Sequence, residues 1–363
     1  MKLSKFKLLI VEDDEGDLET CRTTILRYEK EKEREIELVE SKTLEDAQIK
    51  INNSFDGVII DLKLGNTGDE GNIVIREIHD KYRFPVAILT GTPGNADPDF
   101  NNIINVYKKG EHGLDEILNY LIQIYDTGLT RIFGGRGHIE NAMDKVFWNH
   151  IMPQLDSWIS HVERGEETEQ ALLRFTINHL LEILNHNSDI CYPEEMYISP
   201  VISDNIRTGS IVSDREKGKK YIVMSPACDL VCHSDGNFKT DRILLCEIED
   251  FNIVKDIALK GYKKTEKMKD KVKELINDNY TAYYHWLPKT SVFEGGFINF
   301  RWTKALEKHD FDDNFNLPQV QVSSHFIKDV VSRFSSYYAR QGQPDFNFKL
   351  LSSQLIKDHV GEE

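Results

Sequence analysis

The chain has 363 residues, which is enough for two or three domains with substantial cores. Its 45 Lys and Arg against 61 Asp and Glu give a formal net charge of −16, which argues against duplex DNA or another polyanion as a partner. Apolar runs stay well short of the roughly 18 residues that cross a bilayer, and no secretory hydrophobic segment opens the sequence. Five cysteines are sparse and odd in number, as is typical of reduced thiols. We therefore expect a cytoplasmic protein without a membrane partner.

In the first third of the chain, four apolar segments end abruptly on polar side chains. In chain order these endings are the acids Glu12 and Asp13, the acid Asp61, the hydroxyl of Thr90, and the ammonium groups of Lys108 and Lys109. The segments read as β-strands rich in Val, Ile and Leu. Open α/β sheets keep their ligand sites at the carboxyl ends of the strands. We therefore expect these side chains to converge on one site.

Helical patterns alternate with the strands. Apolar residues recur at helical spacing from Leu18 to Leu26, with Asp17 as the expected N-cap, and again from Leu44 to Ile51. This β-α-β-α order predicts a parallel sheet with right-handed crossovers. Residues 91–100 carry two prolines and little periodicity, which predicts a short or irregular fourth helix. Residues 114–125 form a clear apolar stripe for a fifth.

The four strand endings together resemble the receiver domain of two-component response regulators, over residues 5–126. The resemblance implies a doubly wound α/β fold with a five-stranded parallel sheet. It also implies a Mg²⁺ ion bound by Glu12, Asp13, Asp61 and the backbone carbonyl of Lys63, because Mg²⁺ prefers hard oxygen ligands.

The resemblance further assigns Asp61 as the acceptor of a phosphoryl group from a histidine kinase or phosphotransfer protein. Thr90 is then expected to bond a phosphoryl oxygen, and Lys109 to pair with its charge. Departures from the family pattern occur in a loop after Asp61 that is about two residues longer, and in a lysine strand that has Val106 in place of the usual aromatic and no following Pro. Lys108 is the alternative site lysine.

Residues 127–190 are predicted to form a linker and a helical hairpin. The glycine-rich stretch 128–137 is typical of a hinge, and lacks the preceding strand and the Gly-Lys-Ser/Thr of a phosphate-binding loop. Apolar spacing from Ile139 to Leu184 predicts two helices, the first broken at Pro153. This hairpin is expected either to form a homodimer or to cover the following domain.

Residues 191–363 are predicted to form a β-rich α+β output domain. Five short β-rich runs between residues 209 and 300 surround a basic helix at 263–273, and a last helix spans 326–338 and ends at Gly342. This arrangement predicts a small curled sheet or barrel.

Candidate chemistry in this second half centres on Cys228 and Asp229. Cys228 is a candidate nucleophile with His285 or His233 as its base. The alternative is a structural role, in which Cys228 is packed in the fold and Asp229 caps a turn. Cys228, Cys232 and His233 are also candidate zinc ligands. Zinc sites usually contain two pairs of ligands, and the sequence shows no evident second pair; Cys191 and His186 are the only nearby candidates for it.

Residues 198–340 also resemble a bacterial family of unassigned activity. The shared strings are Gly209-Ser210-Ile211-Val212, Ser225 to Leu230, His285-Trp286-Leu287-Pro288 and Tyr338 to Pro344. The first strands are similar to the small barrel of MazF-type endoribonucleases, which implies a barrel but does not assign an activity.

These patterns favour a response regulator that controls its output by protein contact, in a stress or phage-defence system. No enzymatic activity is expected beyond phosphoacceptor and autodephosphorylation chemistry. The alternatives are an enzymatic output, either a nuclease or a thiol-dependent hydrolase, and an unphosphorylated docking module.

Overall fold

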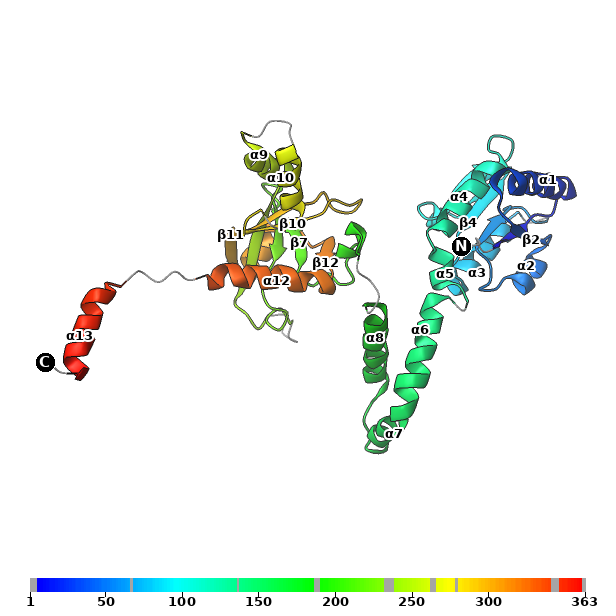
Figure 1. The fold of residues 1–363 in the computed structure, drawn as a ribbon. Helices are drawn as coiled ribbons and strands as arrows, with labels where there is room; N and C mark the ends of the chain where they lie inside the picture. The colour runs from blue at the N-terminus through cyan, green and yellow to red at the C-terminus, as the bar shows by residue number, and fades with distance from the viewer. Residues whose placement is uncertain are drawn as a thin grey trace. The chain divides into compact units, whose positions relative to one another are not determined.

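The computed structural model describes residues 5–65, 68–135, 137–185, 190–231, 238–261, 266–277, 280–340 and 346–360 (Figure 1). The chain divides into two compact units, Met1–Ser188 and Asp189–Glu363, here called the N-terminal and C-terminal units. None of the described helices is long and apolar enough to cross a membrane.

The N-terminal unit contains a five-stranded parallel sheet. Its strands are β1 (Phe6–Val11), β2 (Ile36–Ser41), β3 (Gly57–Ile60), β4 (Val86–Thr90) and β5 (Asn105–Lys108). They are arranged in the order β2-β1-β3-β4-β5 and all pair in parallel. This order is that of the flavodoxin-like doubly wound folds, in which ligands bind beside the carboxyl ends of the strands. The predicted α/β sheet is confirmed.

Helices cover both faces of this sheet. They are α1 (Glu15–Lys32), α2 (Leu44–Lys50), α3 (Glu70–Lys81) and α4 (Leu114–Asp126). One core lies on the side of α1 and α4, and a second on the side of α2 and α3. The predicted N-cap of the first helix is wrong, because Asp14 accepts the N–H of Asp17 at 2.9 Å and Asp17 lies inside α1.

Between β4 and β5 the chain forms two 3₁₀ turns, η1 (Pro93–Asn95) and η2 (Pro98–Phe100). The predicted irregular fourth helix is therefore confirmed. Each proline opens its own turn, where the missing N–H leaves no helical hydrogen bond unmade.

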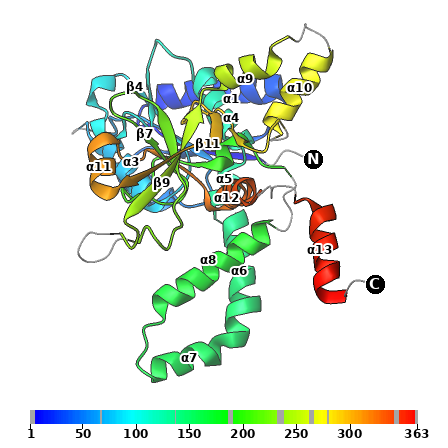
Figure 2. The ribbon, with the colours of Figure 1, turned by 90° about the vertical axis from the view of Figure 1, so that its left-hand side faces the viewer.

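The hairpin follows the short helix α5 (Leu129–Phe133). Its elements are α6 (His138–Val146), a π-helical turn η3 (Phe147–Ile151), a 3₁₀ turn η4 (Met152–Gln154), α7 (Leu155–Glu163) and α8 (Glu169–Asn185). The predicted break falls at Pro153, inside η4. Figure 2 shows α8 returning beside α6 after the bend at α7.

The C-terminal unit is built on a curled sheet of seven antiparallel strands. These are β6 (Tyr197–Ile198), β7 (Ser210–Ser213), β8 (Lys220–Val223), β9 (Arg242–Glu249), β10 (Tyr284–Leu287), β11 (Gly296–Glu307) and β12 (Val320–Val322). Their order is β10-β11-β9-β8-β7-β12-β6. The sequence predicted five of these strands and missed the short β6 and β12, whose two or three residues leave no periodicity to detect.

The described residues of this unit also form five helices. They are α9 (Phe251–Leu259), α10 (Glu266–Ile276), α11 (Lys308–Asn314), α12 (Ser324–Ala339) and α13 (Phe348–Val360). The last predicted helix corresponds to α12, whose apolar side packs on the sheet. The basic helix corresponds to α10, although the first residues predicted for it lie outside the described ranges, as does Gly342. Helices α9, α11 and α13 were not predicted.

Candidate functional site

The strand register brings the predicted site residues to one edge of the parallel sheet. Val11 lies opposite Ile60 on β3, and Ile60 lies opposite Ile88 on β4. Residues that follow these positions in the chain therefore emerge at the same edge. This is the edge at which doubly wound sheets place their ligands.

Three carboxylates meet there. One oxygen from each of Glu12, Asp13 and Asp61 lies within 4.8 Å of the others. Glu12 and Asp61 are buried, whereas Asp13 is exposed. Oxygen ligands of one Mg²⁺ ion, at about 2.1 Å from it, lie at most about 4.2 Å apart. The three oxygens therefore fit a Mg²⁺ ion after only a small inward movement.

Lys109 reaches into this cluster. Its Nζ lies 2.7 Å from an oxygen of each of Glu12, Asp17 and Asp61. Lys108 is exposed and pairs with Glu111 instead. Successive side chains of a strand point to opposite faces, which is why only one of the two lysines enters the site. The lysine that contacts Asp61 is thus Lys109.

Burial and charge oppose each other at these groups. Burial raises the pKa of Glu12, and the hydrogen bond from Lys109 offsets part of that rise. Burial by itself lowers the pKa of Lys109, but the hydrogen bonds that Lys109 donates to Asp17, Asp61 and Glu12 outweigh it and raise that pKa above its usual value. Lys109 therefore stays charged at neutral pH and balances part of the negative charge at the site.

Thr90 ends β4 beside this cluster and is fully buried. Its Oγ1 accepts the N–H of Thr92 at 3.3 Å, while its carbonyl accepts the N–H of Lys109 at 2.9 Å. The residue therefore links the loop after β4 to the lysine.

The backbone N–H of Lys63 lies 3.3 Å from Oδ1 of Asp61. The role of the Lys63 carbonyl as a metal ligand stays a prediction.

Gly71 allows α3 to approach the phosphoacceptor candidate closely. A Cβ atom at this position would lie 2.3 Å from the carbonyl oxygen of Asp61 and 2.5 Å from Cα of Leu62. The N–H of Gly71 also donates to the carbonyl of Leu62 at 3.0 Å. Any larger residue would push the first turn of α3 away from the site.

Asn72 is a positioning residue that sequence reasoning missed. It is buried, and its Nδ2 donates to Oδ1 of Asp69 and to the carbonyl of Asn95 in η1. Its Oδ1 accepts the N–H of Asp97 at 3.2 Å. This amide thus ties α3 to the loop that follows Thr90. A single Asn in an amphipathic helix gives no sequence signal for such a role.

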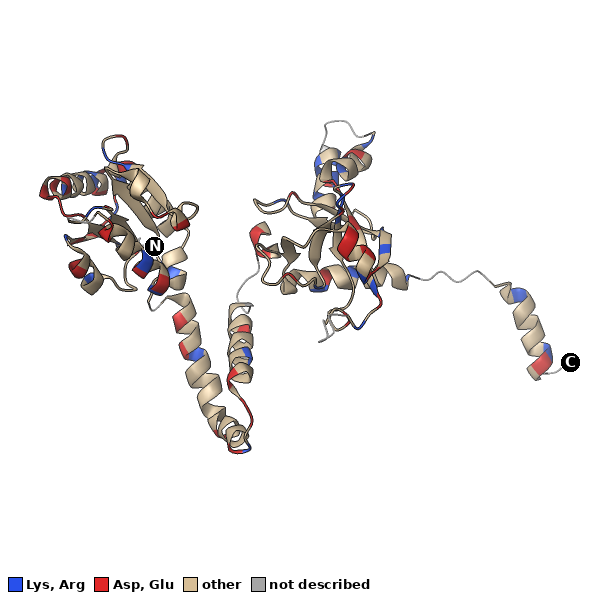
Figure 3. Ribbon diagram, turned by 180° about the vertical axis from the view of Figure 1, so that it is seen from behind, with Lys and Arg blue, Asp and Glu red and all other residues tan. Residues whose placement is uncertain are grey.

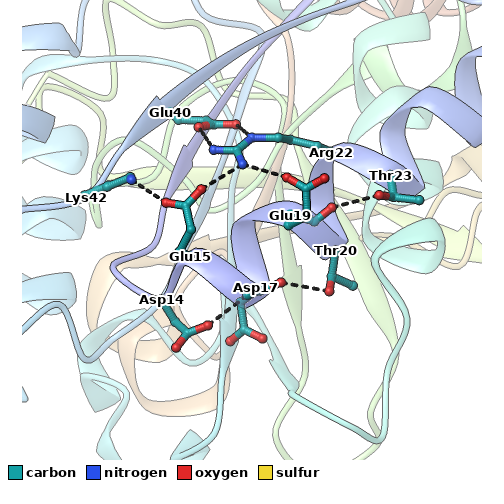
Figure 4. A network of polar contacts seen from close by, with 10 residues as sticks. Asp14, Glu15, Asp17, Glu19, Thr20, Arg22, Thr23, Glu40 and Lys42 are labelled. Carbon is teal, nitrogen blue, oxygen red and sulfur yellow. Dashed lines mark hydrogen bonds and ion pairs between the residues drawn. The ribbon is translucent and has the colours of Figure 1, made fainter.

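A polar network braces the start of α1, where Asp17 is located (Figure 4). Arg22 donates two hydrogen bonds of 2.7 Å to Glu40 on β2 and further bonds to Glu15 and Glu19. The bidentate geometry with Glu40 is the strong form of such a pair. The network fixes the end of α1 that carries Asp17 toward Lys109.

The site residues predicted in the C-terminal unit are not brought together. Cys228 is exposed and lies 3.6 Å from its neighbour Asp229. His285 is buried in β10, and burial together with the charge of Arg333 lowers its pKa to about 3. It lines a cavity of about 260 Å³ with Cys191 and Asp329, and neither Cys228 nor Asp229 belongs to that lining. Cys232, His233 and His186 lie outside the described residues.

Comparison with known proteins finds solved receiver domains that are similar to about one third of this chain. No protein-family model matches the chain, and no curated protein does. Similar solved structures include a CheY-like receiver domain from Methylobacillus flagellatus, with 18% identity, 32% of this chain and 99% of that chain covered, and a TM-score of 0.27. The non-phosphorylated HemR receiver domain from Leptospira biflexa is 27% identical; the match covers 33% of this chain and 93% of that chain, with a TM-score of 0.25. A CheY-like receiver from Methanospirillum hungatei JF-1 is 22% identical; the match covers 34% of this chain and 96% of that chain, with a TM-score of 0.28.

The strand order and the alternation of strands and helices are those of CheY-like proteins. The N-terminal third of the chain therefore has the doubly wound α/β fold with a five-stranded parallel sheet that the sequence resemblance implied. The resemblance of residues 198–340 to a family of unassigned activity stays a prediction.

Proposed function

We propose that this protein is a response regulator in which Asp61 accepts a phosphoryl group and thereby controls the C-terminal unit. The observation that carries the proposal is the 2.7 Å contact between Oδ2 of Asp61 and Nζ of Lys109 inside a cluster of three carboxylates. A buried carboxylate with a fixed cation beside it and acids for a metal nearby is the arrangement that phosphoryl transfer to a side chain requires.

Each residue has a distinct part in this chemistry. An oxygen of Asp61 attacks phosphorus and forms the new O–P bond, while the bond from phosphorus to the donor nitrogen of a phosphohistidine breaks. Lys109 neutralises charge on the transferring group, and Thr90 donates its hydroxyl to a phosphoryl oxygen. Glu12 and Asp13, together with Asp61 and the Lys63 carbonyl, would hold Mg²⁺. When bound, this ion supplies charge neutralisation to the phosphoryl oxygens.

Output through protein contact is the form of control that we infer for the C-terminal unit. A thiol-dependent hydrolase needs a thiolate beside its base. Cys228 lies instead against Asp229, outside the cavity that His285 lines. The buried His285, with its lowered pKa, is also a weak base. The partners upstream of Asp61 are expected to be a histidine kinase or a phosphotransfer protein.

The test is the change in melting temperature on adding Mg²⁺ and beryllofluoride, which mimics a phosphoryl group. A ligand that binds only the folded state raises the melting temperature. We expect such a rise in the wild type, none in Asp61→Asn, and a normal one in Asp80→Asn, which removes an exposed carboxylate on α3. Equal responses of the wild type and Asp61→Asn would refute the proposal.

A further inference from the structure

The hairpin exposes many large apolar side chains. Between residues 143 and 184, eleven large apolar side chains are each more than one-third exposed. They are Met143, Phe147, Trp148, Met152, Leu155, Ile159, Val162, Leu173, Ile177, Leu181 and Leu184. Trp148 is 64% exposed, and α7 has no buried residue.

These side chains are distinct from those that hold the hairpin together. The helices run antiparallel, because the ring of His150 lies 4.9 Å from that of His179 and the ring of Trp158 lies 5.7 Å from that of Phe175. Ala142, Val146 and Ile151 form the buried side of the first arm, and half-buried residues of α8 face it. The hairpin therefore has an inner seam of its own.

Most of the exposed side chains follow an inner one by one position. Met143, Phe147 and Met152 come directly after the buried residues of the first arm, and Ile159 follows Trp158. On α8, Leu173, Ile177, Leu181 and Leu184 follow half-buried residues in the same way.

One position is a rotation of about 100° about a helix axis. In an antiparallel pair, this same rotation turns the outer stripes of both arms toward one side of the hairpin. The two stripes thus form one continuous surface, called here the outer apolar face.

The size and charge of the outer apolar face point to a specific occupant. Its side chains expose on the order of 1,000 Å², against about 600 Å² for the largest patch of a typical monomer and about 800 Å² per partner in a stable interface. None of the eleven positions is charged, and residues 146–155, which join α6 to α7, contain no Lys, Arg, Asp or Glu, so that the lower part of the first arm is tan in Figure 3. Interfaces of homodimers are the most apolar and the poorest in charge.

We propose that the outer apolar face is the interface of a homodimer, in which the hairpins of two chains pack face to face. A two-fold interface uses the same patch on both subunits, so each uncharged face meets an identical one. The product is a four-helix assembly of two antiparallel pairs. This proposal does not depend on phosphorylation of Asp61.

The first experiment is light scattering of the full chain after gel filtration at micromolar concentration, without Mg²⁺ or beryllofluoride. We expect the wild type and Asp61→Asn to have twice the 42.0 kDa mass of one chain. Ile159→Glu combined with Ile177→Glu, one change on each stripe, should halve that mass while circular dichroism keeps its helical signal. The control is Ile49→Glu, which changes an isoleucine that is 82% exposed on α2 and should leave the dimer intact.

A second experiment identifies the occupant without disturbing the fold. A photoreactive phenylalanine analogue at position 159 should give a covalent dimer cross-linked to residues 143–184 of the second copy. A monomeric wild type, a dimer that survives both Glu changes, or a cross-link within one chain to residues 189–363 would each overturn the proposal. The last of these results would show that the outer apolar face is covered by the C-terminal unit.

Discussion

Thr130 Oγ1 donates a hydrogen bond of 2.8 Å to Oδ1 of Asp56, and this bond attaches α5 to the amino end of β3. Asp61 directly follows the carboxyl end of the same four-residue strand. Gly135 reinforces the attachment, because its N–H donates to the carbonyl of Asn53 at 3.0 Å. The stretch expected to be a free hinge is thus anchored to the strand that carries the phosphoacceptor candidate.

We expect Thr130→Val to destabilise the N-terminal unit by about 1–2 kcal/mol, because Asp56 would lose a donor to its partly buried carboxylate. Denaturant unfolding measures this cost. Thr127→Val is the matched control, since Thr127 donates to Ile124 in an exposed turn and its loss should cost less. Equal costs for the two variants would contradict the role of the Asp56 bond.

The same attachment predicts how a signal would leave the receiver. A ligand shifts a conformational equilibrium only if it interacts differently with the two states. With Mg²⁺ and beryllofluoride, hydrogen exchange should therefore change in residues 91–107, next to Thr90, and in residues 128–160. Thr130→Val should reduce the second change and keep the first. A change confined to the site residues would show that the receiver does not act on the hairpin by this route.

Lys109→Met should destabilise the protein by about 2 kcal/mol in the absence of metal, because it leaves two buried carboxylates without their cation. Mg²⁺ should then raise the melting temperature more in this variant than in the wild type, since it restores the missing positive charge. Lys108→Met is the control and should behave as the wild type, because Lys108 pairs with Glu111 at the surface. Identical metal responses in all three proteins would contradict this account.

Gly71→Ala should displace α3 from the site, because its Cβ would lie 2.3 Å from the backbone of Asp61. Overpacking of this kind costs about 1–3 kcal/mol. The response to Mg²⁺ and beryllofluoride should also weaken. At Gly94, where an added Cβ meets nothing within 4 Å, the same change should be tolerated. Thermal melting of both variants, with and without ligand, separates the two cases, and a normal response in Gly71→Ala would argue against the close contact.

The lowered pKa of His285 predicts that the C-terminal unit loses stability in mild acid. Its pKa is about 3 in the fold, against 6.5 for an ordinary imidazole, so between these values the unfolded chain binds the proton that the folded chain does not. Stability is therefore complete above pH 6.5 and falls as the pH decreases. From pH 7 to pH 5 the loss from this group is about 2 kcal/mol.

The measurement compares denaturant unfolding at pH 7 and pH 5. His285→Gln has no imidazole to protonate and should lose about 2 kcal/mol less than the wild type over this interval. His309→Gln removes an exposed imidazole and should keep the wild-type dependence. A wild-type dependence in His285→Gln would show that other groups cause the acid sensitivity.

The sequence alone determined the parallel sheet of the N-terminal unit and the polar residues at its strand ends, because the signals for them are local. Apolar runs that end in Asp61, Thr90 and the lysines predict strands with polar ends, and a parallel sheet brings such ends to one edge whatever the side chains elsewhere. The irregular stretch between β4 and β5 was likewise predictable, since its two prolines act on their own backbone.

Only the tertiary structure decided which contacts form between segments far apart in the chain. The choice of Lys109 over Lys108 depends on where β5 ends relative to β4, and a shift of one residue would reverse it. The separation of Cys228 from His285 depends on the path of a curled sheet, which spacing along the chain does not encode. The sequence also could not predict that the outer apolar face is exposed. Helical periodicity shows which residues are apolar, but not whether another segment covers them.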